Sequence, residues 1–321
     1  MNTILVVAEL ANEKLAMAGL EQLALARRLA PTGTVIALLL GADKAMAEAL
    51  IARGADQVVL GTRKAFDGYN SDGWTACAAA IAREHAVTLV LAAHTPRGAD
   101  LAPRLAFRLN AGCATGCVGV EQKDGTLHFT RASHGGNVRE TLRFETECVV
   151  ATVRAGVYDA LPADTTRTGE IVALDTAPAS RIRIIERQRE DSGAQRLEDA
   201  RVIVAGGRGL NGPEGFKVLE PLAEALGGAV GASRVPCDLG WCSHAMQIGL
   251  TGKTVTPELY IAVGISGASH HLAGCGNAKT IVAINTDADA AIFREAKFGV
   301  VGDYAKVVPA LTVAIKALPS L

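Results

Sequence analysis

Aromatic residues are scarce in this chain, and its charges nearly cancel. Phe, Trp and Tyr make up 4% of the 321 residues, too few for an aromatic platform that stacks single-stranded nucleic acid. The 32 Lys and Arg stand against 33 Asp and Glu, a formal net charge of −1. Nucleic-acid-binding domains usually carry a clear basic excess. We therefore expect no nucleic-acid partner.

Long hydrophobic runs are also missing. The longest apolar stretches, near Val35–Leu40 and Val87–Ala93, fall well short of the ~20 residues that a membrane-spanning helix needs. The first residues, MNTILVVAEL, show neither a basic region nor a small-residue cleavage site, so we expect no signal peptide. These features predict a protein of the bacterial cytoplasm with no membrane span, or of the mitochondrial matrix if the source is eukaryotic.

The seven cysteines do not form a recognisable pattern. Their number is odd and no C-x-x-C occurs, which predicts free thiols in a reducing compartment. Cys237, Cys242 and His244 are close in sequence, but their spacing matches no common zinc site. We predict no metal site.

The chain has ample material for hydrophobic cores, since 49% of its residues are apolar. Its length suggests two domains. In the first half, strand-like and helix-like segments alternate, which predicts a mostly parallel sheet with helices on both faces. The expected strands are 3–10, 34–40, 56–61 and 87–93; the expected helices are 15–30, one capped by Asp43 and running to Arg53, and one capped by Ser71 or Asp72 and running to about His85.

After Asn110 the pattern changes. Short alternating segments between turn signals over 113–158 predict antiparallel strands added to the sheet. Residues 159–179 are rich in Pro, Thr, Ala and Asp and are expected to form a loop, and 181–190 is expected to form one more strand. We place an N-terminal α/β domain at 1–190 and a linker at 191–200.

Residues 201–321 are predicted to form a second, doubly wound α/β domain. A strand and a Gly-rich turn precede a helix from about Pro213 to Leu226, and a final helix runs from about Tyr304 to Leu318. Three apolar strands lie between them, at 258–264, 279–285 and 298–303. In such domains ligands bind beyond the carboxyl ends of the strands.

Polar and glycine-rich segments follow these strands. Gly207–Gly212 matches G-x-G-x-x-G, a pattern of nucleotide-binding loops and also of plain tight turns. Arg208 inside it could clamp a pyrophosphate. The long segment 233–255 is either a functional loop or a solvated excursion. Ser266–Ala268 precede a short helix with His270 and His271 in its first turn, and Asn285 and Asp303 close the next two strands.

These segments carry a resemblance to a known family. LYIAVGISGASHHLAG, VAINTDADAAIF and FGVVGDYAKVVPAL resemble the C-terminal signature of the electron-transfer flavoprotein alpha subunit. GGRGL, GASR and QIGLTGKTVTPELY follow in the order which that family shows. The resemblance is dense from Arg201 to Leu318 and loose in the first half.

The resemblance implies an FAD cofactor in the C-terminal domain and a heterodimer with a beta subunit, which holds AMP or a second FAD. It implies a carrier that takes electrons from flavin dehydrogenases, such as acyl-CoA dehydrogenases, to a quinone-reducing or other acceptor. Arg234 would lie by the isoalloxazine ring, Thr251 near N5 and His271 near the C2 carbonyl, and all three would tune the flavin. The implied FAD contacts are Arg208, Ser233, Arg234, Ile248, Gly249, Leu250, Thr251, Ser266, Gly267, Ala268, Ser269, His270, His271, Asn285, Asp303 and Tyr304.

The sequence departs from the family pattern at three positions and in the unusual loop Trp241–His244. Leu250 stands where Gln is common, and Ser269 and His270 stand where an apolar residue and Gln are common. A second histidine beside the ring would make the flavin potential depend on pH. Two other functions remain open: an NAD(P)-dependent dehydrogenase built on the G-x-G-x-x-G turn, and a non-redox nucleotide-binding module.

Overall fold

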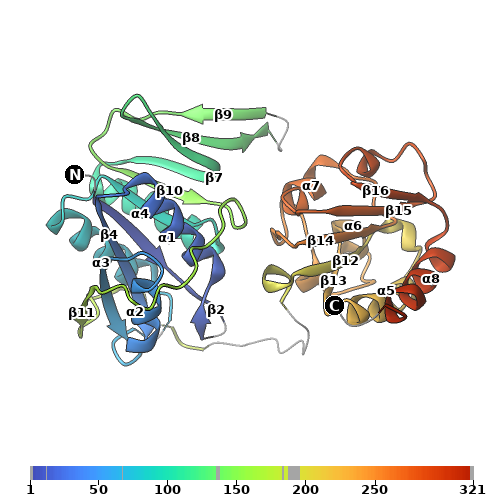
Figure 1. Cartoon of the computed structure of the whole chain (residues 1–321), viewed down its shortest axis with the longest axis horizontal. Helices are drawn as coiled ribbons and strands as arrows, with labels where there is room; N and C mark the ends of the chain where they lie inside the picture. Colours follow the sequence, from blue (N-terminus) through green and yellow to red (C-terminus); the bar gives the residue numbers. More distant parts are fainter. Residues whose placement is uncertain are drawn as a thin grey trace. The chain divides into compact units, whose positions relative to one another are not determined.

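A computed structural model describes residues 3–11, 13–66, 68–134, 138–182, 184–186 and 196–318. The chain divides into two compact units (Figure 1), the first at 1–133 and 138–188 and the second at 134–137 and 189–321. Each unit is built around its own sheet.

The first unit contains a nine-stranded sheet in the order β11-β5-β4-β1-β6-β10-β7-β8-β9. Seven strands, from β11 to β7, run parallel, and β8 and β9 add to them antiparallel. The strands are β1 (Thr3–Ala8), β4 (Thr34–Ala42), β5 (Gln57–Thr62), β6 (Leu89–Ala93), β7 (Gly112–Lys123), β8 (Thr126–Ser133), β9 (Val138–Leu142), β10 (Val149–Val153) and β11 (Glu170–Leu174). A two-stranded ribbon joins β2 (Leu10–Ala11) to β3 (Lys14–Leu15).

Both faces of this sheet are covered. Alternate residues of a strand point to opposite faces, so Ile4 and Val6 enter one core while Leu5 and Val7 enter the other. Helices α1 (Met17–Leu29) and α2 (Lys44–Ile51) contribute to the first core. Helices α3 (Ser71–Glu84) and α4 (Pro96–Leu109) contribute to the second. This explains why the central strands read as continuous apolar runs.

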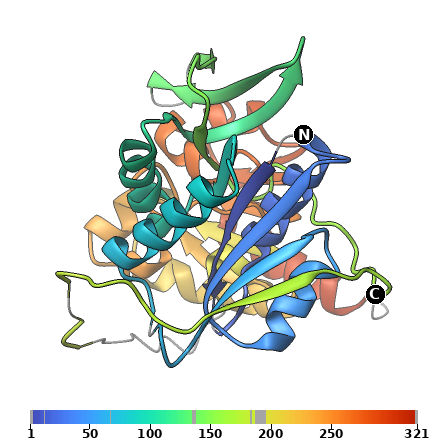
Figure 2. The ribbon, with the colours of Figure 1, turned by 90° about the vertical axis from the view of Figure 1, so that its left-hand side faces the viewer.

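Two predictions in the first half need correction at the level of strands. The segment 113–158 is not wholly antiparallel, because β10 inserts between β6 and β7 and pairs parallel with both. The expected loop at 159–179 contains β11, which pairs parallel with β5 and forms one edge of the sheet. Figure 2, in which the first unit faces the viewer, shows β11 in yellow-green beside the blue strands.

Two smaller corrections concern a helix cap and the expected strand at 181–190. The third helix is capped by Asn70, whose side chain accepts from the backbone N–H of Gly73, and not by Ser71 or Asp72. In the expected strand 181–190, residues 181–182 and 184–186 form no strand; the other five lie outside the described residues. Asp43 caps α2 as predicted, by accepting from the N–H of Met46.

The second unit is a sheet of five parallel strands in the order β13-β12-β14-β15-β16. The strands are β12 (Val202–Gly206), β13 (Ala229–Ala232), β14 (Leu259–Val263), β15 (Ile281–Asn285) and β16 (Phe298–Val301). The helices are α5 (Glu214–Ala225), α6 (Arg234–Asp238), α7 (Ser269–Cys275) and α8 (Tyr304–Lys316). This is the predicted doubly wound arrangement.

One face of the second sheet packs against α5 and α8 through Leu219, Leu222 and Val308. The other face packs against α7 and the long loop through Cys275 and Ile248. Leu197 and Ala200 are buried in this core. Residues 196–200 of the predicted linker therefore pack with the second unit, whereas 191–195 lie outside the described residues.

The fold class predicted from the sequence is confirmed: two α/β units, the first mostly parallel with antiparallel strands added, the second doubly wound. Within the described ranges, every helix is too short or too polar to cross a membrane.

Candidate functional site

The strand order of the second unit defines where a ligand can bind. From β12 the chain moves to β13 on one side and then returns to form β14 on the other side of β12. The two connections diverge at the carboxyl ends of β12 and β14, and doubly wound folds bind ligands in the crevice at such a point. The turns that follow β12 and β14 are therefore the expected position of a binding site.

Glycines join these two turns backbone to backbone. The N–H of Gly209 donates to the carbonyl of Gly264 over 3.0 Å, and the N–H of Gly207 donates to Val263 over 2.9 Å. A Cβ on Gly207 would lie 2.2 Å from the Gly264 oxygen, and Gly264 itself has φ +62°. The G-x-G part of the motif is thus needed for contact with the neighbouring turn, whatever it also offers to a phosphate.

Two cations follow adjacent strand ends at this edge. Arg208 follows β12 in a short 3-10 helix and is exposed. Ser233 follows β13, and its N–H donates to the carbonyl of Gly206 over 2.9 Å. Arg234 is exposed and its Nε donates to Asp238 Oδ2 over 3.0 Å. Exposed pairs of this kind contribute little to stability, so the guanidinium remains available to an anion.

The long loop is tied to the same edge. The N–H of Ile248 donates to the carbonyl of Ala232 over 2.8 Å, and that of Leu250 donates to His270 over 2.7 Å. Ile248 and Gly249 are buried, whereas Leu250 and Thr251 are exposed. Thr251 Oγ1 accepts from Gln247 Nε2 over 3.0 Å. The hydroxyl hydrogen of Thr251 therefore stays free to donate.

The segment after β14 is held by a second close backbone contact. Gly267 has φ +84°, and a Cβ there would lie 2.2 Å from the nitrogen of Ile292. The N–H of Ile292 donates to the carbonyl of Ser266 over 3.1 Å. Ser266, Ala268 and His270 are exposed and Ser269 is half-buried. The turn thus presents polar groups to solvent on a rigid backbone.

His271 lies inside the unit. Its Nδ1 is 3.1 Å from the carbonyl oxygen of Ile248, which can only accept, so Nδ1 carries the proton. The hydroxyl of Tyr260, fully buried, lies 2.9 Å from Nε2 and donates to it. Burial lowers the pKa of His271 to about 4. The ring is therefore neutral at neutral pH, with both nitrogens bonded within the protein.

The last predicted contacts lie at the end of β15 and just beyond β16. Asn285 donates through Nδ2 to the carbonyl of Ile265 over 3.0 Å and accepts from the N–H of Asp287 over 3.0 Å. Asp303 is exposed and caps α8 by accepting from Ala305. Tyr304 donates to the carbonyl of Leu210 over 2.9 Å, so it braces the Arg208 turn. The Asn285 side chain joins neighbouring loops, which leaves one N–H for a ligand.

The structure thus brings a predicted residue to each of the five strand ends, namely Ser233, Arg208, Ser266, Asn285 and Asp303 in sheet order. It also shows residues that sequence reasoning missed: Tyr260, Gln247 and Gly264. The positive φ of Gly264 could have been suspected from a glycine directly after a strand. The Tyr260–His271 bond has no local sequence signal.

Cys237, Cys242 and His244 do not converge as metal ligands do. The two sulfurs are 3.5 Å apart, and His244 Nδ1 faces Gln247 Oε1 at 3.3 Å. Over the ranges the structure describes, no three His, Cys, Asp or Glu side chains form a metal-binding group.

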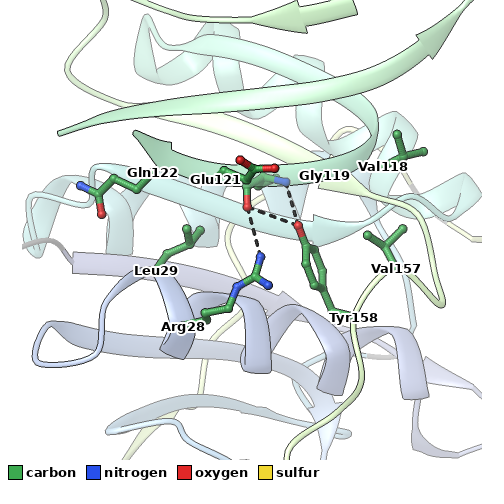
Figure 3. A pocket seen from close by; sticks show the side chains of 9 residues that line it. Arg28, Leu29, Val118, Gly119, Glu121, Gln122, Val157 and Tyr158 are labelled. Carbon is green, nitrogen blue, oxygen red and sulfur yellow. Dashed lines mark hydrogen bonds between the residues drawn. The ribbon is translucent and has the colours of Figure 1, made fainter. Parts of the chain in front are cut away.

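A groove of about 570 Å³ lies in the first unit, and none of these residues lines it. Figure 3 shows Arg28 and Tyr158 beneath the β7 segment that carries Gly119 and Glu121. Both side chains donate to the carbonyl of Val120, each over 3.3 Å. The N–H of Val120 donates to the Tyr158 hydroxyl over 2.7 Å, and the Arg28 guanidinium lies 4.5 Å from the Tyr158 ring centre. Arg28 and Tyr158 thus make these hydrogen bonds within the protein, and the groove contains none of the predicted site residues. We therefore assign the candidate site to the second unit.

The fold and the site define a two-unit α/β protein whose predicted ligand-binding residues gather at the carboxyl edge of its second sheet. Residues 4–179 match the family model of the electron transfer flavoprotein domain. Residues 196–276 match that of the electron transfer flavoprotein FAD-binding domain. The second match spans the Arg208 turn, the long loop and the Ser266–His271 segment.

Curated relatives match along the whole chain. The electron transfer flavoprotein subunit alpha of Bacillus subtilis is 40% identical over 317 residues, 98% of each chain. That of Thermoanaerobacterium thermosaccharolyticum is 41% identical over 323 residues, also 98% of each. Protein FixB of Clostridium saccharobutylicum is 37% identical over 322 residues, 98% of this chain and 96% of that protein. The chain belongs to the electron transfer flavoprotein alpha-subunit family.

Proposed function

We propose that this chain binds FAD at the carboxyl edge of its second sheet and carries electrons as the alpha subunit of a heterodimer with a beta subunit. The observation that carries the proposal is the convergence of the five strand ends, each with a residue that the family resemblance assigns to FAD. The match of 196–276 to an FAD-binding family domain supports it. The chain would act as a carrier and not as an enzyme.

The donor set fits a dinucleotide. Arg208 is an exposed cation at the turn after β12, as a pyrophosphate requires. Arg234 is a second exposed cation at the neighbouring strand end, where it is available to the flavin ring. Ser233, Thr251 and Ser266 add small polar groups in segments that hydrogen bonds hold in place. Bound FAD would supply the capacity to accept and release electrons. The residues of this chain would hold it, orient it and set the charge around its ring.

The charge near the ring is best assigned to Arg234. A reduced flavin carries negative charge near N1 and the C2 carbonyl, which a nearby cation stabilises. His271 is neutral at neutral pH because burial lowers its pKa to about 4. We propose that Arg234 supplies the positive charge, and that His271 serves as a neutral group whose position Tyr260 and Ile248 determine.

The remaining parts of the proposal concern organisation and partners. We propose domains at 1–190 and 201–321 joined by the segment 191–200, of which Leu197 and Ala200 pack in the core of the second domain. The first domain would pack against the beta subunit. Flavin dehydrogenases would donate electrons and a quinone-reducing or other protein would accept them. Whether the beta subunit holds AMP or a second FAD decides between simple carriage and bifurcation. The named relatives come from bacteria, which supports a bacterial, cytoplasmic location.

The first experiment is to measure flavin content in this chain co-expressed with its beta partner. One FAD per heterodimer, with absorbance bands that bleach on anaerobic reduction, is the expected result for a simple carrier. Two FAD per heterodimer would retain the family role and favour bifurcation. A colourless heterodimer that takes up no added FAD would contradict the proposal and favour a non-redox nucleotide-binding module. Reduction only by a nicotinamide substrate would favour a dehydrogenase.

The two arginines provide a sharper test. Arg208→Ala and Arg234→Ala are each expected to raise the Kd for FAD about tenfold or more, since each loses a charge-assisted contact to the ligand. Arg201→Ala is the matched control, because Arg201 is an exposed arginine at the opposite, amino end of β12, where it pairs with Glu258. Titration of flavin-depleted heterodimer measures all three. Equal affinities in the three variants would remove both arginines from the site.

A further inference from the structure

Cys237 and Cys242 are in direct contact on the segment that follows β13. Their sulfurs are 3.5 Å apart. All seven cysteines lie in the described part of the chain and are free thiols. Among the hydrogen-bond contacts that the structure describes, this is the only one between two cysteine sulfurs. Neither the family role nor the proposed FAD site gives the pair a function.

A local turn produces the contact. Gly240 has φ +73° and its N–H donates to the carbonyl of Cys237, while the N–H of Trp241 donates to that of Pro236, each over 2.9 Å. These two bonds form a Schellman motif, which ends α6 and folds the chain back over its last turn. Cys242 is the next residue. The backbone therefore holds the two thiols together, and the contact does not depend on rotamers alone.

The environment of the two sulfurs differs. Cys237 is buried, 3% exposed, and its sulfur lies 3.6 Å from the carbonyl oxygens of Ser233 and Ser243. Cys242 is half-buried. A reagent in solution therefore reaches Cys242 before it can reach Cys237, which is more deeply buried. A disulfide needs a sulfur–sulfur distance of about 2.05 Å. The two sulfurs are 3.5 Å apart, so they would have to approach by about 1.5 Å.

We propose that Cys237 and Cys242 form a reversible dithiol–disulfide site, oxidised by a small-molecule disulfide of the glutathione class. The Cys242 thiolate attacks one sulfur of the reagent, whose own S–S bond breaks, and one half leaves as a thiol. Cys237 then attacks the Cys242 sulfur and expels the second half. One S–S bond forms in the protein, and the two electrons and two protons reside on two reduced reagent molecules.

The site is independent of the FAD proposal, because its product is read directly from the mass of a peptide. Trypsin cuts after Arg234 and after Lys253, so one peptide, 235–253, carries both thiols and no other cysteine. Burial raises the pKa of both thiols, that of Cys242 to about 12. Thiolates are therefore scarce at neutral pH, and the reaction is best followed at about pH 8.5.

The experiment equilibrates the reduced, full-length chain with its partner subunit in oxidised and reduced glutathione of varied ratio. Remaining thiols are alkylated before digestion. We expect peptide 235–253 to become unalkylated and two hydrogens lighter as the ratio rises, and to recover fully with dithiothreitol. Cys242→Ser abolishes this product, whereas Cys148→Ser, which removes another half-buried thiol, leaves its yield unchanged.

Two results would overturn the proposal. In one, both thiols stay open to alkylation in the native protein under glutathione ratios that close the disulfide in the urea-unfolded chain. In the other, glutathione remains attached to Cys242 and the Cys237–Cys242 disulfide does not form. Cys237→Ser should accumulate that mixed disulfide, so this variant identifies the attacking thiol even where Cys242→Ser reduces the yield of folded protein.

Discussion

Replacing Gly207 by alanine is expected to destabilise the second unit by more than about 3 kcal/mol and to abolish FAD retention. The new Cβ would lie 2.2 Å from the carbonyl oxygen of Gly264, 2.7 Å from its carbonyl carbon and 2.8 Å from the Cα of Ile265. All three are backbone atoms, so no side-chain rotation relieves the overlap. The β12 and β14 turns would have to separate, which breaks the Gly209–Gly264 hydrogen bond.

Gly302→Ala is the matched control for this variant. A Cβ on Gly302, in the same unit, would meet the Val307 side chain at 3.3 Å and the Val300 side chain at 3.9 Å, and both side chains can shift. Thermal unfolding of the heterodimer and hydrogen exchange over β12 and β14 measure both variants. A Gly207→Ala protein within about 1 kcal/mol of the parent would mean that the two turns are not locked together as the structure shows.

Lowering the pH is expected to cost the second unit about 3 kcal/mol between pH 6.5 and about 4 through His271 alone. Burial holds the pKa of this ring at about 4 in the folded chain, against 6.5 for an ordinary histidine. The unfolded chain therefore binds a proton in this range while the folded chain does not. The stability is fully present above pH 6.5 and is lost as the pH falls toward 4, because proton binding stabilises the unfolded chain while the buried ring stays neutral in the folded one.

His271→Asn is expected to flatten this pH dependence, because the amide cannot titrate there and its Nδ2 can still donate toward Ile248. His270→Asn is the control, since the neighbouring ring is exposed to water and its loss should leave the slope unchanged. Hydrogen exchange over β14 and α7, corrected for the intrinsic effect of pH, measures the opening free energy in the assembled heterodimer. An unchanged slope in His271→Asn would show that another group controls it.

Much of the fold follows from local sequence patterns. Continuous apolar runs such as 34–40 and 87–93 form β4 and β6, and Asp43 caps α2 at the predicted residue. Strand β11 escaped prediction because its apolar run, Ile171–Leu174, is only four residues long and follows a segment rich in Pro, Thr, Ala and Asp. Strand β10 was recognisable as a strand, but its insertion between β6 and β7 depends on residues more than 30 positions away.

The candidate site divides in the same way. The sequence by itself determined the second unit as doubly wound, and with it the positions of Arg208, Ser266, Asn285 and Asp303 at strand ends, because each lies close to the end of its strand in the chain. Its motifs also determined the family resemblance. These features depend on neighbours in sequence and on the general geometry of parallel sheets.

Only the tertiary structure decided the contacts between distant segments. It showed that Gly207 and Gly209 pack against Gly264, that Tyr260 donates to a neutral His271, and that Cys242 folds back onto Cys237. A glycine pattern does not reveal which backbone approaches it, and two adjacent histidines do not reveal which one is buried. Burial and pairing are properties of the packed chain, so the charge of His271 and the contact of the two thiols emerge only when the elements come together.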